Sequence, residues 1–290
     1  MNKLITIISI FDKHEDFIEL QYKSILKNIK GNYEYIIFNN ASSEIQRNKN
    51  TETCSKLNIK CIDIYQNYDS CPSGIAGTAL NESFKYLNDK IVLKLDSDMF
   101  FINKFNVNQL LNDIDLLYVP NRNISIGEYA WSGIFGINLQ KIKENLNFLP
   151  GIIPYTDTFG QSIILFNNLS YTKKSLLLLN LQKIENLIYT TSINNDCSFI
   201  FNSSNEVLSI ENKNYIEVKE YNTIIDKFKQ IENILIQNNF PKAYNVDLIY
   251  FNNQEFIIHF KSSNWCPWYT EDYINLKKQA LIKLLDLINV

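Results

Sequence analysis

Two carboxylates stand one residue apart directly after a short apolar run in the middle of this chain. The run is Ile91–Leu95, and the acids are Asp96 and Asp98. Placing two acids at the tip of a buried strand costs free energy unless a cation neutralises them. Carboxylate oxygens are ligands that suit Mg²⁺ and Mn²⁺. The pattern therefore predicts a divalent cation held by Asp96 and Asp98, at a site suited to an anionic, phosphate-bearing substrate.

A second Asp-x-Asp pattern, at residues 113–115, has a different context. It follows a segment predicted to be helical, residues 106–112, and precedes an apolar run at residues 116–120. Acids between a helix and a strand are typical of a solvated connection. We therefore assign the metal role to Asp96 and Asp98, and interpret Asp113 and Asp115 as solvated acids.

The elements that must position the first pair alternate between strand and helix through the first 120 residues. Strands are predicted at residues 4–10, 34–38, 60–65 and 91–95, and helices at 15–28, 43–57 and 75–87, the last after a turn at 71–74. This alternation with short connections predicts right-handed crossovers and a mostly parallel sheet. Ligands bind outside the carboxyl ends of such strands, where Asp96 and Asp98 lie.

The second half of the chain is less regular. Its pattern predicts a strand at 132–139, short helical segments at 140–145 and 159–166, a helix at 217–237, a hairpin at 248–251 and 254–260, and a terminal helix at 272–288; the apolar stretch 176–188 is ambiguous. The sequence has no internal repeat or linker. We expect one domain over residues 1–290, with a regular half to residue 120 and a less regular half from residue 121.

Composition excludes several classes of protein. The net charge is −3 and the only arginines are Arg47 and Arg122, so no basic stripe predicts a nucleic-acid partner. The five cysteines include no Cys-x-x-Cys, which argues against a zinc site or a disulfide framework and favours a reducing compartment.

No run is long enough to span a bilayer. We expect a cytoplasmic protein, with peripheral membrane attachment as an alternative. The apolar face of the terminal helix would be core or a homodimer surface.

Four features in this order resemble nucleotide-sugar-dependent glycosyltransferases of the GT-A fold, particularly those of family 2. They are the opening strand with its helix, the segment 35–42 with its polar turn, Asn81 within residues 77–81, and Leu95–Asp98. The resemblance covers residues 1–165. It implies an α/β, Rossmann-like GT-A fold, with a mostly parallel sheet flanked by helices. The first half would bind a nucleotide-sugar and the second an acceptor.

The same resemblance implies a reaction and its cofactor. A metal-dependent transferase would move a sugar from a nucleoside diphosphate sugar, with a UDP-sugar favoured, to a glycan, lipid-linked or protein hydroxyl, using Mn²⁺ or Mg²⁺. Asp98 would ligate the metal directly, and Asp96 would hold the ribose or a metal-bound water. The nucleotide-sugar site implied in this way consists of Ser9, Phe11, Asn39, Ser73, Asn81, Asp96, Ser97, Trp131 and Gly133.

Three of these positions have an explanation of their own. Asn39 stands where the family usually carries an Asp that contacts the nucleobase, and an amide can both donate and accept a hydrogen bond. Trp131 offers an aromatic face to a sugar ring, and Gly133 allows close backbone approach. Core packing is the alternative for Trp131.

The resemblance also implies roles for Asp157 and His259. Residues 155–160 stand where inverting members carry a catalytic acid, so Asp157 would be the general base that takes the acceptor proton; helix capping by Asp157 or Thr158 is the alternative. His259 resembles the C-terminal metal-binding His of many GT-A enzymes, against a hydrogen-bonded core His as the alternative. The segment 259–268 is also similar to the ending of the retaining, glycogenin-like family, although the Lys before Pro267 is absent.

Two further functions compete with this one. A nucleotidyltransferase on a related fold needs a Gly-rich, basic phosphate loop after the first strand, and residues 11–15 lack it. A non-catalytic carbohydrate-binding or assembly protein could share the fold, because a fold does not establish a function.

Overall fold

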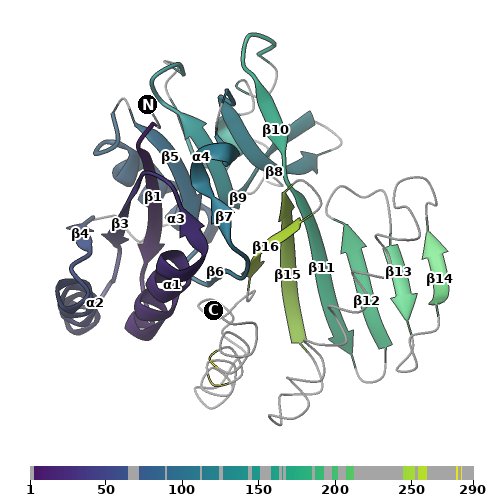
Figure 1. Cartoon of the computed structure of the whole chain (residues 1–290), viewed down its shortest axis with the longest axis horizontal. Coiled ribbons are helices and arrows are strands. Elements are labelled where there is room, and N and C mark those ends of the chain that lie inside the picture. Colours follow the sequence, from purple (N-terminus) through teal and green to yellow (C-terminus); the bar gives the residue numbers. More distant parts are fainter. Residues whose placement is uncertain are drawn as a thin grey trace. The chain divides into compact units, whose positions relative to one another are not determined.

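The structure of the protein is a computed structural model (Figure 1). It describes residues 3–64, 72–88, 90–111, 113–123, 127–142, 146–150, 158–162, 165, 168–184, 187–192, 198–201, 207–211, 244–251, 254–259, 279 and 282. The chain divides into two compact units, which we describe separately. The first consists of Met1–Tyr22, Ile29–Met99 and Lys104–Leu176, and the second of Lys23–Asn28, Phe100–Asn103 and Leu177–Val290.

The first unit is built on a seven-stranded sheet with the strand order β10-β8-β9-β5-β1-β3-β4. Its strands are β1 (Ile5–Phe11), β3 (Tyr33–Asn39), β4 (Lys60–Asp63), β5 (Ile91–Leu95), β8 (Leu116–Asn123), β9 (Gly127–Asn138) and β10 (Lys173–Ser175). Only β9 runs against its neighbours, because it pairs antiparallel with β5 and β8, whereas β1–β3, β1–β5, β3–β4 and β8–β10 are parallel. The predicted mostly parallel α/β sheet is confirmed.

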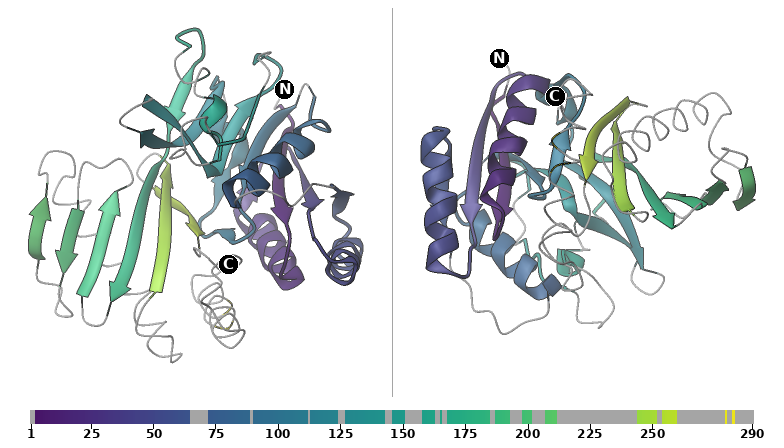
Figure 2. Two further views of the ribbon diagram at one scale, coloured as in Figure 1. Left: turned by 180° about the vertical axis from the view of Figure 1, so that it is seen from behind. Right: turned by 90° about the horizontal axis from the view of Figure 1, so that it is seen from below.

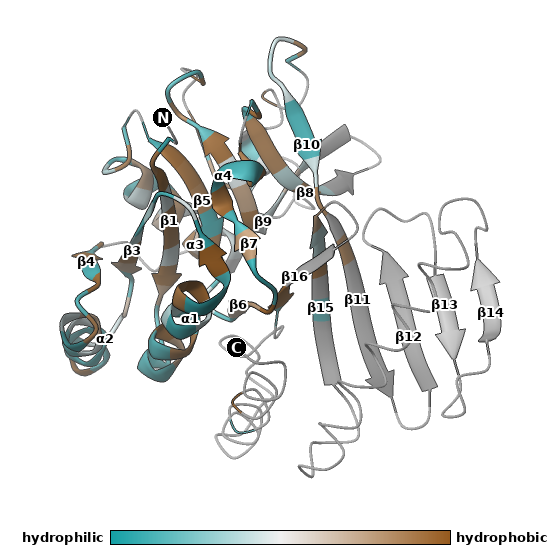
Figure 3. Cartoon of the chain, viewed as in Figure 1, coloured by the Kyte–Doolittle hydropathy of each residue, from teal (hydrophilic) through white to brown (hydrophobic). Residues whose placement is uncertain are grey.

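Helices cover both faces of this sheet (Figure 2). They are α1 (Glu15–Asn28), α2 (Glu44–Lys56), α3 (Pro72–Phe84) and the short α4 (Val107–Leu110). Residues of α3 share a buried cluster with Ile8, Ile36 and Val92, which lie on one face of the sheet. Gln21 of α1 contacts Tyr35, which lies on the other face because neighbouring strand residues point to opposite sides. The central strands β1 and β5 are apolar and buried on both faces, as parallel strands usually are (Figure 3).

The helix boundaries follow local signals. Ser43 caps α2, since its Oγ accepts a hydrogen bond from Gln46 N at 3.2 Å. The third helix begins at Pro72, so the prediction of a turn at residues 71–74 is wrong at 72–74. Proline suits the first helical position, because the missing N–H would have no partner inside the helix there. A two-stranded parallel sheet joins β2 (Ile29–Lys30) to β7 (Phe105–Asn106).

The second unit contains a further seven-stranded sheet, with the order β14-β13-β12-β11-β15-β16-β6. Its strands are β6 (Met99–Phe101), β11 (Leu177–Ile184), β12 (Leu187–Ser192), β13 (Ser198–Phe201), β14 (Val207–Glu211), β15 (Tyr244–Phe251) and β16 (Gln254–His259). The pairs from β11 to β14, and the pairs β11–β15 and β15–β16, are antiparallel. In β6, Phe101 is held by Ser24 and Asn28, through bonds of 3.2 and 2.9 Å.

Predictions for the second half have mixed outcomes. The ambiguous stretch 176–188 forms β11 and the start of β12, and the predicted hairpin is confirmed as β15 and β16. Residues 139–141 form a turn at the start of the predicted helical segment 140–145, and Gly160–Ser162 forms a 3-10 helix, η1, within the predicted helical segment 159–166. The predicted helix 217–237 and all but residues 279 and 282 of the terminal helix lie outside the described residues. One domain with halves meeting at residue 120 stays a prediction. Among the described helices, none is long and apolar enough to cross a membrane.

Candidate active site

The Asp96–Asp98 segment forms a tight turn at the carboxyl end of β5. Met99 N donates to Asp96 O at 3.2 Å, which closes the turn, and Asp96 N donates to Gly133 O on β9 at 2.9 Å. The Asp98 residue is 6% exposed, whereas the side chain of Asp96 is 38% exposed. Burial of a carboxylate is costly unless a cation or hydrogen-bond donors compensate for it. The turn thus has the composition and the burial expected of a cation site.

Gln21 on α1 holds the backbone of this turn. Its Nε2 donates to Asp96 O at 2.8 Å and to Met99 O at 2.7 Å, and its Oε1 accepts from the Tyr35 hydroxyl at 2.6 Å. Burial raises the pKa of Tyr35, so this hydroxyl stays a neutral donor. Gln21 lies three residues after Ile18 on the buried face of α1, and this polar residue at a core-facing position was the missed sequence signal.

Lys94 holds the side chain of the turn's first acid. Its ammonium lies on β5 with the side chain 5% exposed, and it donates to Asp96 Oδ1 and to Ser132 O, the latter at 2.6 Å. Sequence reasoning passed over this lysine. The available signal was its position two residues before Asp96, because residues i and i+2 of a strand point to the same face.

Trp131 and Gly133, both predicted to line a sugar pocket, lie against each other on β9. A Cβ atom added to Gly133 would come within 2.2 Å of the Trp131 ring, so the ring occupies the space that a larger residue would fill. Trp131 is half-buried. The structure therefore brings these two residues together beside the Asp96 turn, to which Gly133 O is bonded. A contact between Trp131 and a sugar stays a prediction.

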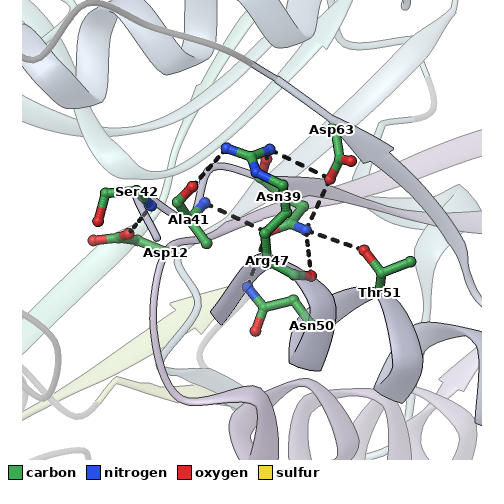
Figure 4. A network of polar contacts seen from close by, with 8 residues as sticks. All are labelled: Asp12, Asn39, Ala41, Ser42, Arg47, Asn50, Thr51 and Asp63. Atoms are coloured by element: carbon green, nitrogen blue, oxygen red, sulfur yellow. Dashed lines mark hydrogen bonds and ion pairs between the residues drawn. The ribbon is translucent and has the colours of Figure 1, made fainter. Parts of the chain in front are cut away.

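Asn39, at the carboxyl end of β3, is the centre of a polar network (Figure 4). Its Nδ2 donates to Asp63 Oδ1 at 2.8 Å and to Arg47 O at 3.0 Å, and its Oδ1 accepts from Asn50 Nδ2 at 3.0 Å. The residue is fully buried. These protein contacts use the amide groups that we expected to meet a nucleobase. Asn39 also fixes Asp63, whose carboxylate is 40% exposed and lies 3.4 Å from Arg47. A contact between Asn39 and a nucleobase stays a prediction.

The remaining predicted nucleotide-sugar residues are embedded in the fold of the first unit. Ser9 and Phe11 are fully buried on β1. Asn81 holds the segment 147–148, since its Nδ2 donates to Asn147 Oδ1 and its Oδ1 accepts from Phe148 N. Their contacts with a ligand stay predictions.

The region of the predicted base is described only in part. Asp157 lies outside the described residues. Its neighbour Thr158 donates from its hydroxyl to Ser73 O at 3.0 Å, which joins this segment to the start of α3. Ser73 is therefore engaged through its backbone, and its predicted contact with the nucleotide-sugar stays a prediction.

In the second unit, His259 is held by a buried acid that sequence reasoning missed. His259 Nδ1 lies 2.8 Å from Asp247 Oδ2, and the two residues face each other across β15 and β16. Asp247 is fully buried and His259 is 5% exposed. A carboxylate on one ring nitrogen fixes the tautomer and the ring orientation, an arrangement common among metal-binding histidines. It also satisfies the alternative prediction of a hydrogen-bonded core His.

Several solved structures share part of this fold. A mannosyltransferase from Pyrobaculum calidifontis, PcManGT, in complex with GDP-Man and Mn²⁺, is 11% identical with a TM-score of 0.41, and the match covers 59% of this chain and 54% of that one. The galactosyltransferase LgtC, in complex with donor and acceptor sugar analogues, is 20% identical with a TM-score of 0.34, and the match covers 47% of this chain and 58% of that one. TarS from S. aureus is 21% identical with a TM-score of 0.31, over 41% of this chain and 22% of TarS. No protein-family model matches the sequence, and no curated protein matches it.

Proposed function

We propose that this chain is a metal-dependent glycosyltransferase that moves a sugar from a nucleoside diphosphate sugar to an acceptor hydroxyl. The observation that carries the proposal is the Asp96–Asp98 turn, which stands at the carboxyl end of a buried parallel strand and contains a buried carboxylate. A UDP-sugar is the favoured donor, and the acceptor is a glycan, a lipid-linked sugar or a protein. A cytoplasmic location and a homodimer stay predictions from the sequence.

The proposed cation ligands are Asp96 and Asp98 and, from the resemblance to the C-terminal metal-binding His of many GT-A enzymes, His259. Two carboxylates with one imidazole are a donor set that suits Mn²⁺, and also Mg²⁺ if water and phosphate oxygens complete the shell. The hydrogen bond that Asp247 accepts from the His259 ring supports the role of His259, because it fixes the imidazole. When bound, the ion supplies Lewis-acid stabilisation of the departing nucleoside diphosphate.

The protein's own groups would bind and orient the two substrates. Asp98 would bind the cation, and Asp96 would face the ribose or a metal-bound water. Trp131 would offer its half-buried ring to the sugar. Asp157 would accept the proton of the attacking hydroxyl, which gives an inverting reaction.

A donor panel tests the proposal. UDP-, GDP- and other sugar nucleotides would be incubated with the wild-type chain in Mn²⁺ or in EDTA, and release of the nucleoside diphosphate measured. We expect release from one donor class, dependent on Mn²⁺ and reduced at least about 100-fold in Asp98→Asn, because loss of one precisely placed electrostatic group costs about 10²–10³ in rate.

The second Asp-x-Asp provides a matched control. Asp113 is exposed, with φ at 58°, a conformation that Asn also tolerates. Asp113→Asn should therefore keep the wild-type rate. The interpretation of Asp115 as a solvated acid is wrong, because it is 3% exposed and accepts from Thr172 N at 3.0 Å. Release that is equal in EDTA, or that survives in Asp98→Asn, would contradict metal dependence. Release that survives in Asp157→Asn would place the base at another residue.

A further inference from the structure

We propose that Lys94 is a positioning residue that sets the orientation of the Asp96 carboxylate in the nucleotide-sugar site. The inference rests on the proposed function, because it assigns a task to a group inside that site. Its basis is a buried ammonium that has no explanation in the packing of the sheet. Lys94 is 4% exposed, in a strand whose other four residues are apolar.

The position of Lys94 in the strand directs it at Asp96. Lys94 is the last residue but one of β5, and Asp96 is the first residue after the strand. The Lys94 ammonium donates to Asp96 Oδ1, which makes a charge-assisted hydrogen bond, the stronger kind. One oxygen of Asp96 is therefore held by the protein before any ligand arrives.

The other contacts of the ammonium explain why this group is a lysine. An ammonium has three donor hydrogens and no acceptor. Besides Asp96 Oδ1, its acceptors are Ser132 O at 2.6 Å and Gly133 O at 3.4 Å. Gly133 O also accepts from Asp96 N at 2.9 Å. Lys94 thus joins the side chain of Asp96 to the part of β9 that follows Trp131, where Gly133 O already holds the backbone of the turn.

Lys94 also changes the charge that an incoming diphosphate would meet. Asp96 and Asp98 carry two negative charges, and the ammonium offsets one of them. Like charges about 4 Å apart repel one another more strongly in a protein than in water, because the effective dielectric constant is lower. Without Lys94, the first acid would be both less ordered and more repulsive toward phosphate oxygens. We therefore expect its loss to weaken nucleotide binding as well as turnover.

A second lysine on the same strand provides a matched control. Lys90 precedes β5, and its ammonium bonds Glu34 Oε1 at the amino end of the sheet. The pair has the same chemistry as Lys94–Asp96 but lies away from the carboxyl ends where ligands bind. Lys90→Met should leave nucleotide binding unchanged.

The test is a double-mutant cycle that uses UDP and Mn²⁺ as probes. UDP affinity in saturating Mn²⁺ would be measured by calorimetry for the wild type, Lys94→Met, Asp96→Ala, the double variant and Lys90→Met. We expect Lys94→Met to weaken UDP binding about 10–100-fold, the usual effect of losing a group that orients a ligand-binding residue. In the Asp96→Ala background the same change should have little further effect, because residues that act through one another are not additive. Lys94→Arg should restore part of the affinity, since it keeps a charged donor.

The outcomes separate this inference from the proposed function. Wild-type affinity in Lys94→Met, or equal losses from that change in both backgrounds, would overturn the positioning role while leaving the transferase proposal intact. Failure of the wild-type chain to bind UDP with Mn²⁺ would overturn this inference and the choice of UDP as donor, whereas the transferase proposal is overturned only if no nucleotide of the donor panel is bound or cleaved. If Lys94→Met does not fold, as judged by near-UV circular dichroism, Lys94→Gln takes its place in the cycle, with the same outcomes.

Discussion

The two ends of strand β5 each carry a lysine bonded to a carboxylate, but the two pairs differ in their surroundings. At the amino end, the Lys90 and Glu34 side chains are 30% and 31% exposed. At the carboxyl end, Lys94 is 5% exposed beside an Asp96 that is 38% exposed. In the first pair, both side chains are partly exposed to solvent, and to the same extent. In the second, the cation is buried and the acid faces outward.

This difference in burial indicates that the lysine–carboxylate pair has a different role at each end of β5. A partly solvated ion pair contributes little to stability, about 0–1 kcal/mol, and it needs no exact geometry. A buried ammonium depends on its acceptors, because removal of a partner leaves a charge in a medium of low polarity. The amino-end pair helps to join β1, β3 and β5, whereas the carboxyl-end pair fixes one side chain in a candidate binding site.

The largest expected effect is an asymmetry within the carboxyl-end pair. Asp96→Ala should lower the free energy of unfolding by about 3 kcal/mol, since it leaves the Lys94 ammonium buried without its carboxylate. Lys94→Met should cost about 1 kcal/mol, because the Asp96 carboxylate that remains can be hydrated. Urea unfolding of both variants measures the difference. If both variants lost the same free energy of unfolding, Lys94 and Asp96 would depend on each other equally. The carboxyl-end pair would then not differ in this respect from the amino-end pair.

The second unit contains a third pair, Asp247–His259, in which the acid and not the base is the fully buried group. Here the buried acid orients a candidate metal ligand. Asp247→Asn should weaken Mn²⁺ binding about 10–100-fold, because an amide fixes the imidazole less firmly than a carboxylate does. Paramagnetic resonance of free Mn²⁺ reports the affinity. His259→Gln is the reference for complete loss of that ligand, and unchanged affinity in both variants would remove His259 from the ligand set.

The smallest expected effect is the pH dependence of the amino-end pair. Burial acts to raise the pKa of Glu34, but hydrogen bonds from Lys90 and Thr6 outweigh it and lower the pKa below its usual 4.5. A carboxyl whose pKa is lower in the folded state stabilises the protein above the unfolded-state pKa. That contribution is lost as the pH falls through the folded-state value.

Glu34→Gln should therefore cost less than about 1 kcal/mol near neutral pH, and the difference from wild type should shrink below about pH 4.5. Thermal unfolding between pH 3 and pH 7 measures this trend. A difference that grows toward acid pH would contradict the assigned direction of the pKa change.

The first sheet was predictable because its signals are local. Three of the strands, β1, β3 and β4, are each followed by a polar or amphipathic helical pattern, and β5 is a short apolar run, so all four could be placed by inspection. Parallel order then follows from the handedness of the connections. The Asp96–Asp98 turn was found for the same reason: its acids directly follow one of these runs.

The second sheet was less predictable, because antiparallel partners are set by register. Leu177–Ile184 contains both alternating and continuous apolar segments, so its type stayed ambiguous. In the β15–β16 hairpin, a simple count outward from the turn pairs Asp247 with Ile258. A register shift between Ile249 and Tyr250 instead places Asp247 opposite His259. The sequence carries no visible signal for such a bulge, so the partner of His259 could not be derived.

The network around Asn39 was missed for another reason. Its partners Arg47, Asn50 and Thr51 come from α2, a helix of polar composition with no apolar stripe to indicate which face is buried. One face of this helix is in fact turned toward the end of β3, where Asn50 is fully buried. Polar residues that pair with one another inside a fold look the same in a sequence as polar residues in water.

The most direct test of the central claim is calorimetric titration of the wild-type chain with UDP, once in Mn²⁺ and once in EDTA. The account predicts binding in Mn²⁺ that is lost in EDTA, and that is weakened at least about 100-fold by Asp98→Ala, since loss of a metal ligand removes the cation that neutralises the diphosphate. Equal UDP affinity in Mn²⁺ and EDTA, or wild-type affinity in Asp98→Ala, would contradict a cation site at the end of β5.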